Sequence, residues 1–226
     1  MDLTQELEEY IDILLNKEEG RPGRDYLKFR GIEISTAVYW KIGYCPLNYI
    51  ATPYRNSDIN WGEKMGGRIT FPIFDANGLL VSISGRLALS LDKPKYDMYN
   101  FIKKRVLFGL HQNKNNIREQ NSIIITEGQL DVISAWQNGI TNVASSFGAH
   151  CSLYHLGLAA RYCSDIYILY DEDMAGLSGA EDIKDFSTCG DLNVFIKTGI
   201  FPKGEDLDSF LKKHSKDELE MLLNII

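Results

Sequence analysis

One stretch, Asp165 to Gly176, constrains the fold of this chain more than any other. It reads DIYILYDEDMAG, and its apolar run at residues 166–170 has the length and the β-branched and aromatic content of a buried strand. Asp171 and Asp173 follow this run, so we expect them at the carboxyl end of a strand, where open α/β sheets bind ligands. Two carboxylates with one residue between them suit a divalent cation such as Mg2+, and an N-cap beside solvated acids is the alternative.

The rest of the C-terminal half repeats this alternation of strand and helix. Further candidate strands lie at residues 122–126, 142–145 and 192–196, and segments with helical spacing separate them. We expect a polar linker at residues 112–121, ahead of the first of these strands. The alternation predicts a mostly parallel sheet flanked by helices, in which the carboxyl ends of the strands share one crevice.

Acidic residues follow two more of the predicted strands. Glu127 comes directly after the first strand, and Asp131 lies one turn into the helix that follows. Asp206 and Asp208, again separated by one residue, occupy the loop after the last strand. Together with the two aspartates described above, these carboxylates would repel one another in a shared crevice, and bound cations would relieve that repulsion. The alternative is local, with Asp131 as an ordinary first-turn acid and Asp206 as an N-cap.

The first part of the chain predicts a different architecture, a smaller α+β subdomain. The expected elements are an acidic amphipathic helix at residues 2–19, short helices at 24–29 and 35–41, a loop at 44–66, and a hairpin with strands at 68–74 and 79–87. Pro72 lies inside the first hairpin strand, which favours an edge strand or a bulge because proline donates no ladder hydrogen bond. At the other end of the chain, a capping box at Ser215 to Glu218 predicts a last helix, with residues 219–226 at its core.

Charge is distributed unevenly along the chain, although its sum is only −7. Residues 21–118 hold 16 basic and seven acidic side chains, whereas residues 119–226 hold seven basic and 17 acidic ones. Between residues 94 and 105, lysine and arginine are mixed with tyrosine and phenylalanine, which suits phosphates and unstacked bases. A phosphate-binding block followed by a cation-binding block would produce this pattern, and solvated faces without a special function are the alternative.

Several other classes of protein find no support in the sequence. No apolar stretch approaches the roughly 18 residues that a membrane span needs. The acidic N-terminus has no signal-peptide pattern, so we expect a cytoplasmic protein without a membrane partner. The four cysteines include no CxxC pair, and the spacing of His150, Cys151, His155 and Cys163 matches no standard zinc site.

Nine short motifs, taken in order, resemble the RNA-polymerase core of bacterial and phage DnaG-type DNA primases. Among them, the order EG…D, DxDxxG and a later DxD identifies a TOPRIM domain. The motifs are YLKFRGI from Tyr26, GRITFPIFDANG ending at Gly78, ISGRL from Ile83, PKY from Pro94, FIKKRVLFGL from Phe101, TEGQLDV from Thr126, ASSFG from Ala144, YDEDMAG from Tyr170 and PKGEDLDSFL from Pro202.

The resemblance implies a role for each candidate site residue. The catalytic acids would be Glu127, Asp171 and Asp173. The metal ligands would be these three acids together with Asp131, Asp206 and Asp208. Template and incoming nucleotide would be held by Arg30, Arg68, Arg86, Lys95, Lys103 and Arg105. Two or more Mg2+ or Mn2+ ions would serve the attack of a 3′ hydroxyl on the α-phosphate of a nucleoside triphosphate.

The activity implied by the resemblance is that of a DNA primase core, which makes short RNA primers on single-stranded DNA from NTPs. A TOPRIM nuclease or nicking enzyme would use the same acids, and a non-catalytic replication adaptor would keep only the fold; both are alternatives. The family's zinc ribbon and helicase-binding region have no counterpart in the sequence. We therefore expect a replicative helicase or a separate zinc-binding subunit as a partner. The expected location is a bacterial cell, and the gene could also come from a phage or a plasmid.

The predicted fold class is α/β, with a TOPRIM-type, mostly parallel sheet flanked by helices and preceded by a smaller basic α+β subdomain. This prediction divides the chain into four segments. They are an N-terminal acidic helix at residues 1–20, a basic nucleic-acid-binding subdomain at 21–118, a TOPRIM catalytic domain at 119–212 and a C-terminal helix at 213–226.

Overall fold

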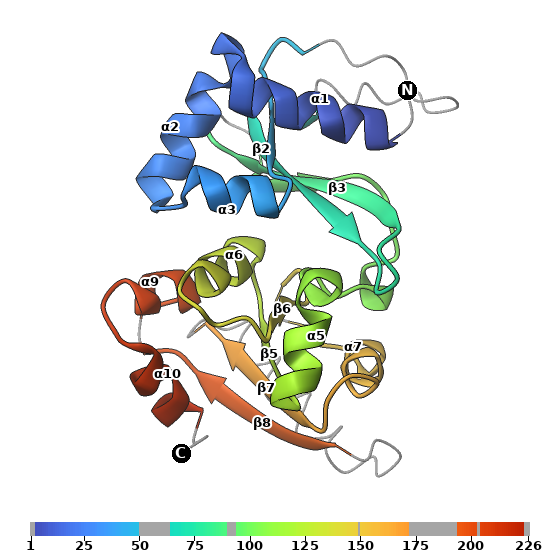
Figure 1. Ribbon diagram of the computed structural model, residues 1–226, viewed down its shortest axis with the longest axis vertical. Helices are drawn as coiled ribbons and strands as arrows, with labels where there is room; N and C mark the ends of the chain where they lie inside the picture. The colour runs from blue at the N-terminus through green and yellow to red at the C-terminus, as the bar shows by residue number, and fades with distance from the viewer. Residues whose placement is uncertain are drawn as a thin grey trace. The chain divides into compact units, whose positions relative to one another are not determined.

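The computed structural model (Figure 1) describes residues 3–49, 64–89, 94–148, 150–171, 194–202 and 204–223. The chain forms two compact units. The first unit contains residues 1–74 and 79–101, and the second contains residues 75–78 and 102–226. In the described part of the chain, no helix is both long enough and apolar enough to span a membrane.

The first unit is built on an antiparallel sheet with the strand order β1–β2–β3–β4. The strands are β1 (Gly43–Cys45), β2 (Arg68–Phe74), β3 (Leu80–Leu87) and β4 (Tyr96–Met98). The predicted hairpin is confirmed as β2 and β3. β2 lies between two other strands, so the prediction of an edge strand at Pro72 is wrong, whereas the predicted bulge is present between Ile73 and Phe74. The bulge disrupts the ladder next to a residue that cannot donate to it.

The helices with described bounds in the first unit are α1 (Leu3–Asn16), α2 (Arg21–Arg30) and α3 (Ile34–Tyr39), with a short 3-10 helix η1 (Glu18–Gly20) between the first two. α1 buries Leu7, Tyr10 and Leu14, which share one face at helical spacing, against β1 and β3. The loop predicted at residues 44–66 is wrong at its start, because Tyr44 and Cys45 are buried and paired in β1. Residues 50–63 of that prediction lie outside the described residues.

The second unit confirms the predicted parallel sheet. Its strand order is β6–β5–β7–β8, and every pairing is parallel. The strands are β5 (Ser122–Thr126), β6 (Val143–Ser145), β7 (Asp165–Tyr170) and β8 (Phe195–Ile200). The helices among the described residues of this unit are η2 (Lys103–Arg105), α5 (Leu110–Gln120), α6 (Gln129–Gln137), α7 (Leu153–Ala159), α9 (Leu207–Leu211) and α10 (Lys216–Leu222).

Two predictions for the second unit are wrong. The polar linker expected at residues 112–121 is helix α5, which buries Leu110, Asn113 and Ile117 on one face. Asn113 satisfies its polarity inside the fold, because its amide donates a hydrogen bond to the carbonyl of Val143 at 2.8 Å. The end predicted for the last strand is also wrong, because β8 (Phe195–Ile200) shares residues 195–196 with the predicted range but ends four residues later. Residues 192–193 of that range lie outside the described residues.

Local signals at the helix ends are borne out. Ser215 and Glu218 form the predicted capping box of α10, with the Ser215 N–H donating to Glu218 Oε2 at 2.8 Å. α10 ends at Leu222 and residues 224–226 lie outside the described residues, so the predicted helix is observed in its first part. Near the other end of this unit, the turn at residues 75–78 packs on α5, where the Lys114 ammonium donates to the Ala76 carbonyl at 3.3 Å.

Candidate active site

Glu127 and Asp171 meet at one edge of the parallel sheet in the second unit. Glu127 directly follows β5 and Asp171 directly follows β7, and these two strands are paired neighbours. The backbone N–H of Asp171 donates a hydrogen bond to Glu127 Oε1 at 3.1 Å. The strand pairing therefore explains why two acids 44 positions apart in sequence are in contact. Asp173 lies outside the described residues.

The loop after β6 holds the backbone of Glu127. The Ser145 hydroxyl donates to the Glu127 carbonyl at 3.0 Å, and the Gly148 N–H donates to the same oxygen at 3.0 Å. Phe147, between them, has a φ of +64°, which is uncommon for a residue other than glycine. Its N–H donates to Ser145 Oγ at 3.2 Å. The sequence analysis used ASSFG only as a family motif and predicted no role for Ser145. The available signal was the position of two serines and a glycine at the end of a predicted strand.

Asp131 lies in the first turn of α6, and its side chain is only 7% exposed. Its Oδ2 accepts a hydrogen bond from the Gly128 N–H at 3.0 Å, which closes the N-terminus of the helix. Gly128 is required by this contact, because a Cβ there would lie 2.4 Å from the same oxygen. Burial raises the pKa of Asp131 to about 7, and the negative charges of Asp206, Asp171 and Asp208 add to the effect.

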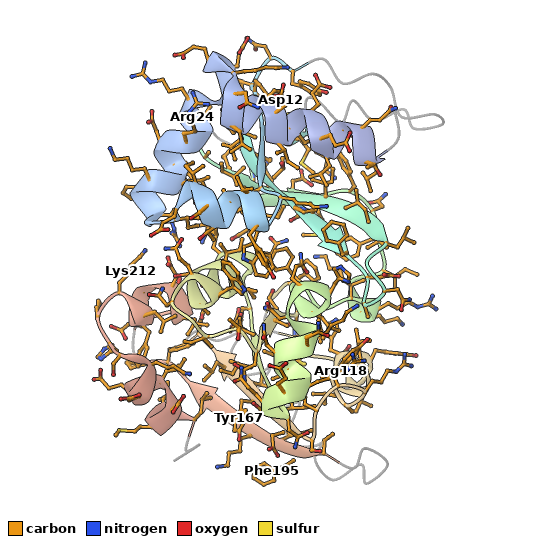
Figure 2. All side chains as sticks on the ribbon, in the orientation of Figure 1. Asp12, Arg24, Arg118, Tyr167, Phe195 and Lys212 are labelled. Carbon is orange, nitrogen blue, oxygen red and sulfur yellow. The ribbon has the colours of Figure 1, made fainter. Side chains whose placement is uncertain are left out.

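Asp206 and Asp208 approach from α9, which packs against α6. Asp206 is the N-cap of α9 and accepts from the Ser209 N–H at 2.8 Å, as the local alternative in the sequence predicted. Asp208 is 4% exposed and accepts from the ammonium of Lys212, the residue that directly follows α9 (Figure 2), at 3.0 Å. Capping and ion pairing hold both carboxylates in place.

The acids thus form one electrostatic group of oxygen donors. The charges of three of them, Asp206, Asp171 and Asp208, act on Asp131, and the prediction that all the acids share one crevice stays a prediction. Among the residues that the structure describes, no three histidine, cysteine, aspartate or glutamate side chains are already arranged as a metal cluster. The donor set itself suits a hard divalent cation, since Mg2+ and Mn2+ prefer carboxylate oxygens. A bound cation would also neutralise the net negative charge of these carboxylates.

The predicted basic residues fall in both units. Arg68 lies inside the first unit at 1% exposure, and its guanidinium donates to the carbonyls of Lys64 at 3.0 Å and Lys95 at 3.2 Å. Lys95 is exposed just before β4, and Arg30 is the half-buried last residue of α2. In the second unit, the exposed Lys103 and Arg105 belong to η2. Their roles toward template and nucleotide remain predictions.

His155 anchors η2 on α7. Its Nε2 is 3.1 Å from the Lys103 carbonyl, to which it donates in the neutral form, and its Nδ1 accepts from the Ser152 N–H at 3.2 Å. Burial lowers the pKa of His155. His155 is therefore a satisfied structural histidine, consistent with the prediction that it belongs to no standard zinc site.

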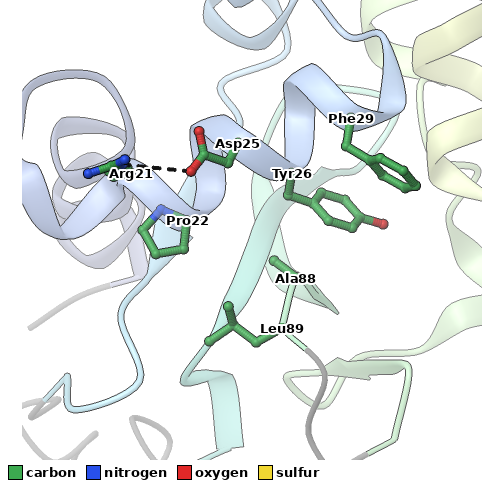
Figure 3. Close-up of a pocket in the computed structure, with 7 residues that line it drawn as sticks. All are labelled: Arg21, Pro22, Asp25, Tyr26, Phe29, Ala88 and Leu89. Atoms are coloured by element: carbon green, nitrogen blue, oxygen red, sulfur yellow. Dashed lines mark ion pairs between the residues drawn. The ribbon is translucent and has the colours of Figure 1, made fainter.

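Arg86 is held between two tyrosines of the first unit. Its Nε donates to the Tyr26 hydroxyl at 2.5 Å, and its Nη1 donates to the Tyr96 hydroxyl at 2.5 Å. The guanidinium carbon also lies 5.0 Å from the centre of the Tyr96 ring. Next to this network, Tyr26 and Phe29 of α2 and Leu89 after β3 line a hollow of about 620 Å³ (Figure 3). Sequence reasoning identified Arg86 and missed the hollow.

Comparison with known proteins identifies the family. A model of the Toprim-like family matches residues 124–211, which include every acid described above. The DNA primase of Legionella pneumophila is 30% identical over 98% of this chain and 42% of its own length. A DNA primase domain from Pseudomonas aeruginosa has the same fold with a TM-score of 0.86, at 26% identity over 98% of this chain and 77% of that one. Along nearly its whole length, the chain is similar to the RNA polymerase domain of DnaG-type DNA primases.

The match to this primase family confirms the resemblance read from the nine motifs and the predicted fold class. The chain spans about two fifths of the length of the curated primases that it matches. A third relative, a DnaG primase catalytic domain solved with bound single-stranded DNA, shares the fold with a TM-score of 0.81 at 24% identity, over 98% of this chain and 81% of that one. Toprim domains are generally metal-dependent.

Proposed function

We propose that this chain is the catalytic core of a DNA primase, which joins ribonucleotides from NTPs into short primers on single-stranded DNA. One observation carries the proposal. Glu127 and Asp171 are joined at the carboxyl ends of two neighbouring parallel strands, inside the segment that matches the Toprim-like family. Primase relatives that align along nearly the whole chain support the same activity.

Divalent cations are part of this proposal. Glu127, Asp171 and Asp173 would hold them, and Asp131, Asp206 and Asp208 would complete the acidic surroundings of two or more Mg2+ or Mn2+ ions. Burial raises the pKa of Asp131 to about 7, and the negative charges of Asp206, Asp171 and Asp208 add to the effect. The contribution of these charges supports the assignment, because bound cations would offset the repulsion among the carboxylates. When bound, such ions would neutralise the triphosphate and stabilise the charge that develops during nucleotidyl transfer.

The chain's own residues would position the reactants. Glu127 is fixed through its side chain by the Asp171 N–H and through its carbonyl by Ser145, so its carboxylate has a defined direction. This kind of preorganisation is the main contribution that a protein makes to phosphoryl transfer. Template and nucleotide phosphates would be bound by Arg30, Arg86, Lys95, Lys103 and Arg105. The buried Arg68 would act through the backbone of Lys95.

Single-stranded DNA and NTPs are the proposed binding partners, and the DNA-bound relative supports the first of them. A replicative helicase or a zinc-binding subunit is proposed as a further partner. The bacterial origin of the relatives supports a place in the cytoplasm of a bacterium, whether the gene is chromosomal, phage or plasmid.

The test is primer synthesis on single-stranded DNA with labelled NTPs in Mg2+ or Mn2+. Glu127→Gln and Asp171→Asn should abolish the products, and the second variant keeps the backbone N–H that donates to Glu127. Glu119→Gln, at an exposed position of α5, is the matched control and should retain wild-type synthesis. Nicking of supercoiled DNA without primer synthesis would instead support a nuclease, and DNA binding without either activity would support an adaptor.

A further inference from the structure

One side of α2 carries an apolar stripe that is only partly covered within its own unit. α2 buries Gly23 and Leu27, while Pro22, Tyr26 and Phe29 follow one another at intervals of four and three residues on another side. Phe29 is 82% exposed, the most exposed of the large apolar side chains described. Phe29 does not stand alone, because it lines one hollow together with the apolar side chains of Pro22, Tyr26 and Leu89, and contiguous apolar surfaces of this kind mark binding sites.

This stripe forms one wall of the hollow of about 620 Å³ shown in Figure 3. Ala88 and Leu89, which directly follow β3, form another wall. The volume lies within the usual range of ligand sites, about 300–1,000 Å³. We call this space the α2 hollow and define it by Pro22, Tyr26, Phe29, Ala88 and Leu89.

The walls of the α2 hollow are held rigidly. The Arg24 guanidinium donates to the carbonyls of Leu14 at 2.7 Å and Lys17 at 2.9 Å, which fixes α2 to α1 (Figure 2). The Tyr26 hydroxyl accepts from Arg86, which fixes the tyrosine ring to the sheet. A preformed aromatic wall loses little conformational entropy when a flat ligand stacks on it.

Charge decides which ligand suits this space. Among the residues that the structure describes, the lining contains one cation, Arg21, and its guanidinium is 3.8 Å from the carboxylate of Asp25 (Figure 3). A free nucleoside triphosphate needs several cations around its phosphates, and the described lining residues supply one that is already paired. A base that belongs to a strand brings no such requirement, because phosphates of the strand can be bound elsewhere. α2 itself carries four basic residues and one acid, so the strand would approach a positive helix.

We infer that the α2 hollow binds one unstacked base of single-stranded DNA, which stacks on Phe29 and Tyr26. This inference rests on the proposed function, since it assigns a subsite to the template strand. Arg86 connects this subsite with the proposed function, because it is predicted to hold template or nucleotide and it donates a hydrogen bond to the hydroxyl of Tyr26. Base stacking on aromatic side chains tolerates any sequence, as a primase template requires.

The test measures binding of a fluorescent oligothymidine by anisotropy, without NTPs or primer synthesis. Phe29→Ala should weaken binding about 5- to 100-fold, and Phe29→Trp should restore wild-type affinity. The slope of log affinity against log salt should stay unchanged, because the substitution removes no phosphate contact. Phe195→Ala is the control, since Phe195 is 54% exposed at the amino end of β8, away from the acids (Figure 2), and it should bind as wild type.

A second arm separates stacking from other effects. On an oligonucleotide made of abasic sites, wild type and Phe29→Ala should bind equally, because the phosphates remain and the bases are gone. Unchanged oligothymidine binding by Phe29→Ala would overturn the inference, and so would a loss that persists on the abasic strand. Binding is measured separately from primer synthesis. If the protein makes no primers but Phe29→Ala still weakens oligothymidine binding, the proposed primase activity is contradicted and the base-binding inference is not.

Discussion

Ser145 offers the sharpest test of how the fold positions Glu127. Its side chain is fully buried, its hydroxyl donates to the Glu127 carbonyl at 3.0 Å, and its oxygen accepts from the Phe147 N–H at 3.2 Å. Ser145→Ala removes both hydrogen bonds without adding volume. The Glu127 carbonyl keeps the Gly148 N–H as a donor, so its position should loosen rather than collapse.

The magnitude follows from these contacts. Two hydrogen bonds at about 0.5–1.5 kcal/mol each give a loss of about 1–3 kcal/mol in the free energy of unfolding of the second unit. Phe147 sharpens the effect, because its backbone has a φ of +64° and such strain persists only where surrounding contacts enforce it. For catalysis, a displacement of about 1 Å in a positioned group costs about 100-fold in rate. We expect primer synthesis to fall about 10- to 100-fold while DNA affinity stays unchanged.

The assay pairs urea unfolding with primer synthesis, each corrected for the folded fraction. Ser82→Ala is the matched control, because Ser82 is equally buried and its hydroxyl donates to the Tyr99 carbonyl at 3.0 Å in the first unit. It should lose similar stability and keep full synthesis per folded molecule. If both variants lose synthesis by the same factor, Ser145 has no special relation to Glu127 and the reasoning is wrong.

Three further predictions concern the second unit and its ligands, with one comparison in the first. Gly78→Ala should lower the free energy of unfolding by more than Gly31→Ala does. Both glycines have positive φ, but a Cβ at Gly78 would lie 2.5 Å from His111, whereas a Cβ at Gly31 would meet open space. Equal losses of stability in urea unfolding would refute the packing argument. The wild type should lose stability as pH falls below about 6.5, because the unfolded chain protonates His155 there while the folded chain does not. The loss should stop once pH falls below the lowered pKa of His155 in the folded protein, and His155→Gln should lack this part of the pH profile. Mg2+ should raise the Tm of the wild type but not that of Asp171→Asn, and an equal rise in both would exclude Asp171 as a ligand.

The acidic side of the site was predictable from sequence because it depends on strand ends. β5 and β7 are continuous apolar runs that stop on an acid, and parallel strands bring their carboxyl ends to one edge. Glu127 and Asp171 could therefore be expected at the same edge of the sheet without knowing which strands pair. The detailed roles of Asp131 and Asp206 as helix caps were also local, since a cap needs only its own first turn.

Other features depend on contacts between segments distant in sequence. α5 looked like a linker because one of its three buried positions is Asn113, whose amide is satisfied by a strand 30 residues away. The end of β8 was missed because pairing with β7 extends the strand through Lys197, Thr198 and Gly199, and neither lysine nor glycine favours a strand by itself. The α2 hollow needs residues 22–29 and 88–89 side by side, and no spacing in the sequence predicts that.

Arg68 shows the same limit at a residue that the family resemblance did identify. The donor fork that suits phosphate also suits backbone carbonyls, and in this fold the guanidinium is buried among the carbonyls of Lys64, Gly85 and Lys95. Burial lowers the pKa of Arg68, whereas a bound phosphate would favour its charged form. Because Arg68 holds the backbone of Lys95, whose side chain is exposed, it can influence phosphate binding through the position of Lys95. A residue type can thus be matched by sequence while the atoms it serves are decided by the fold.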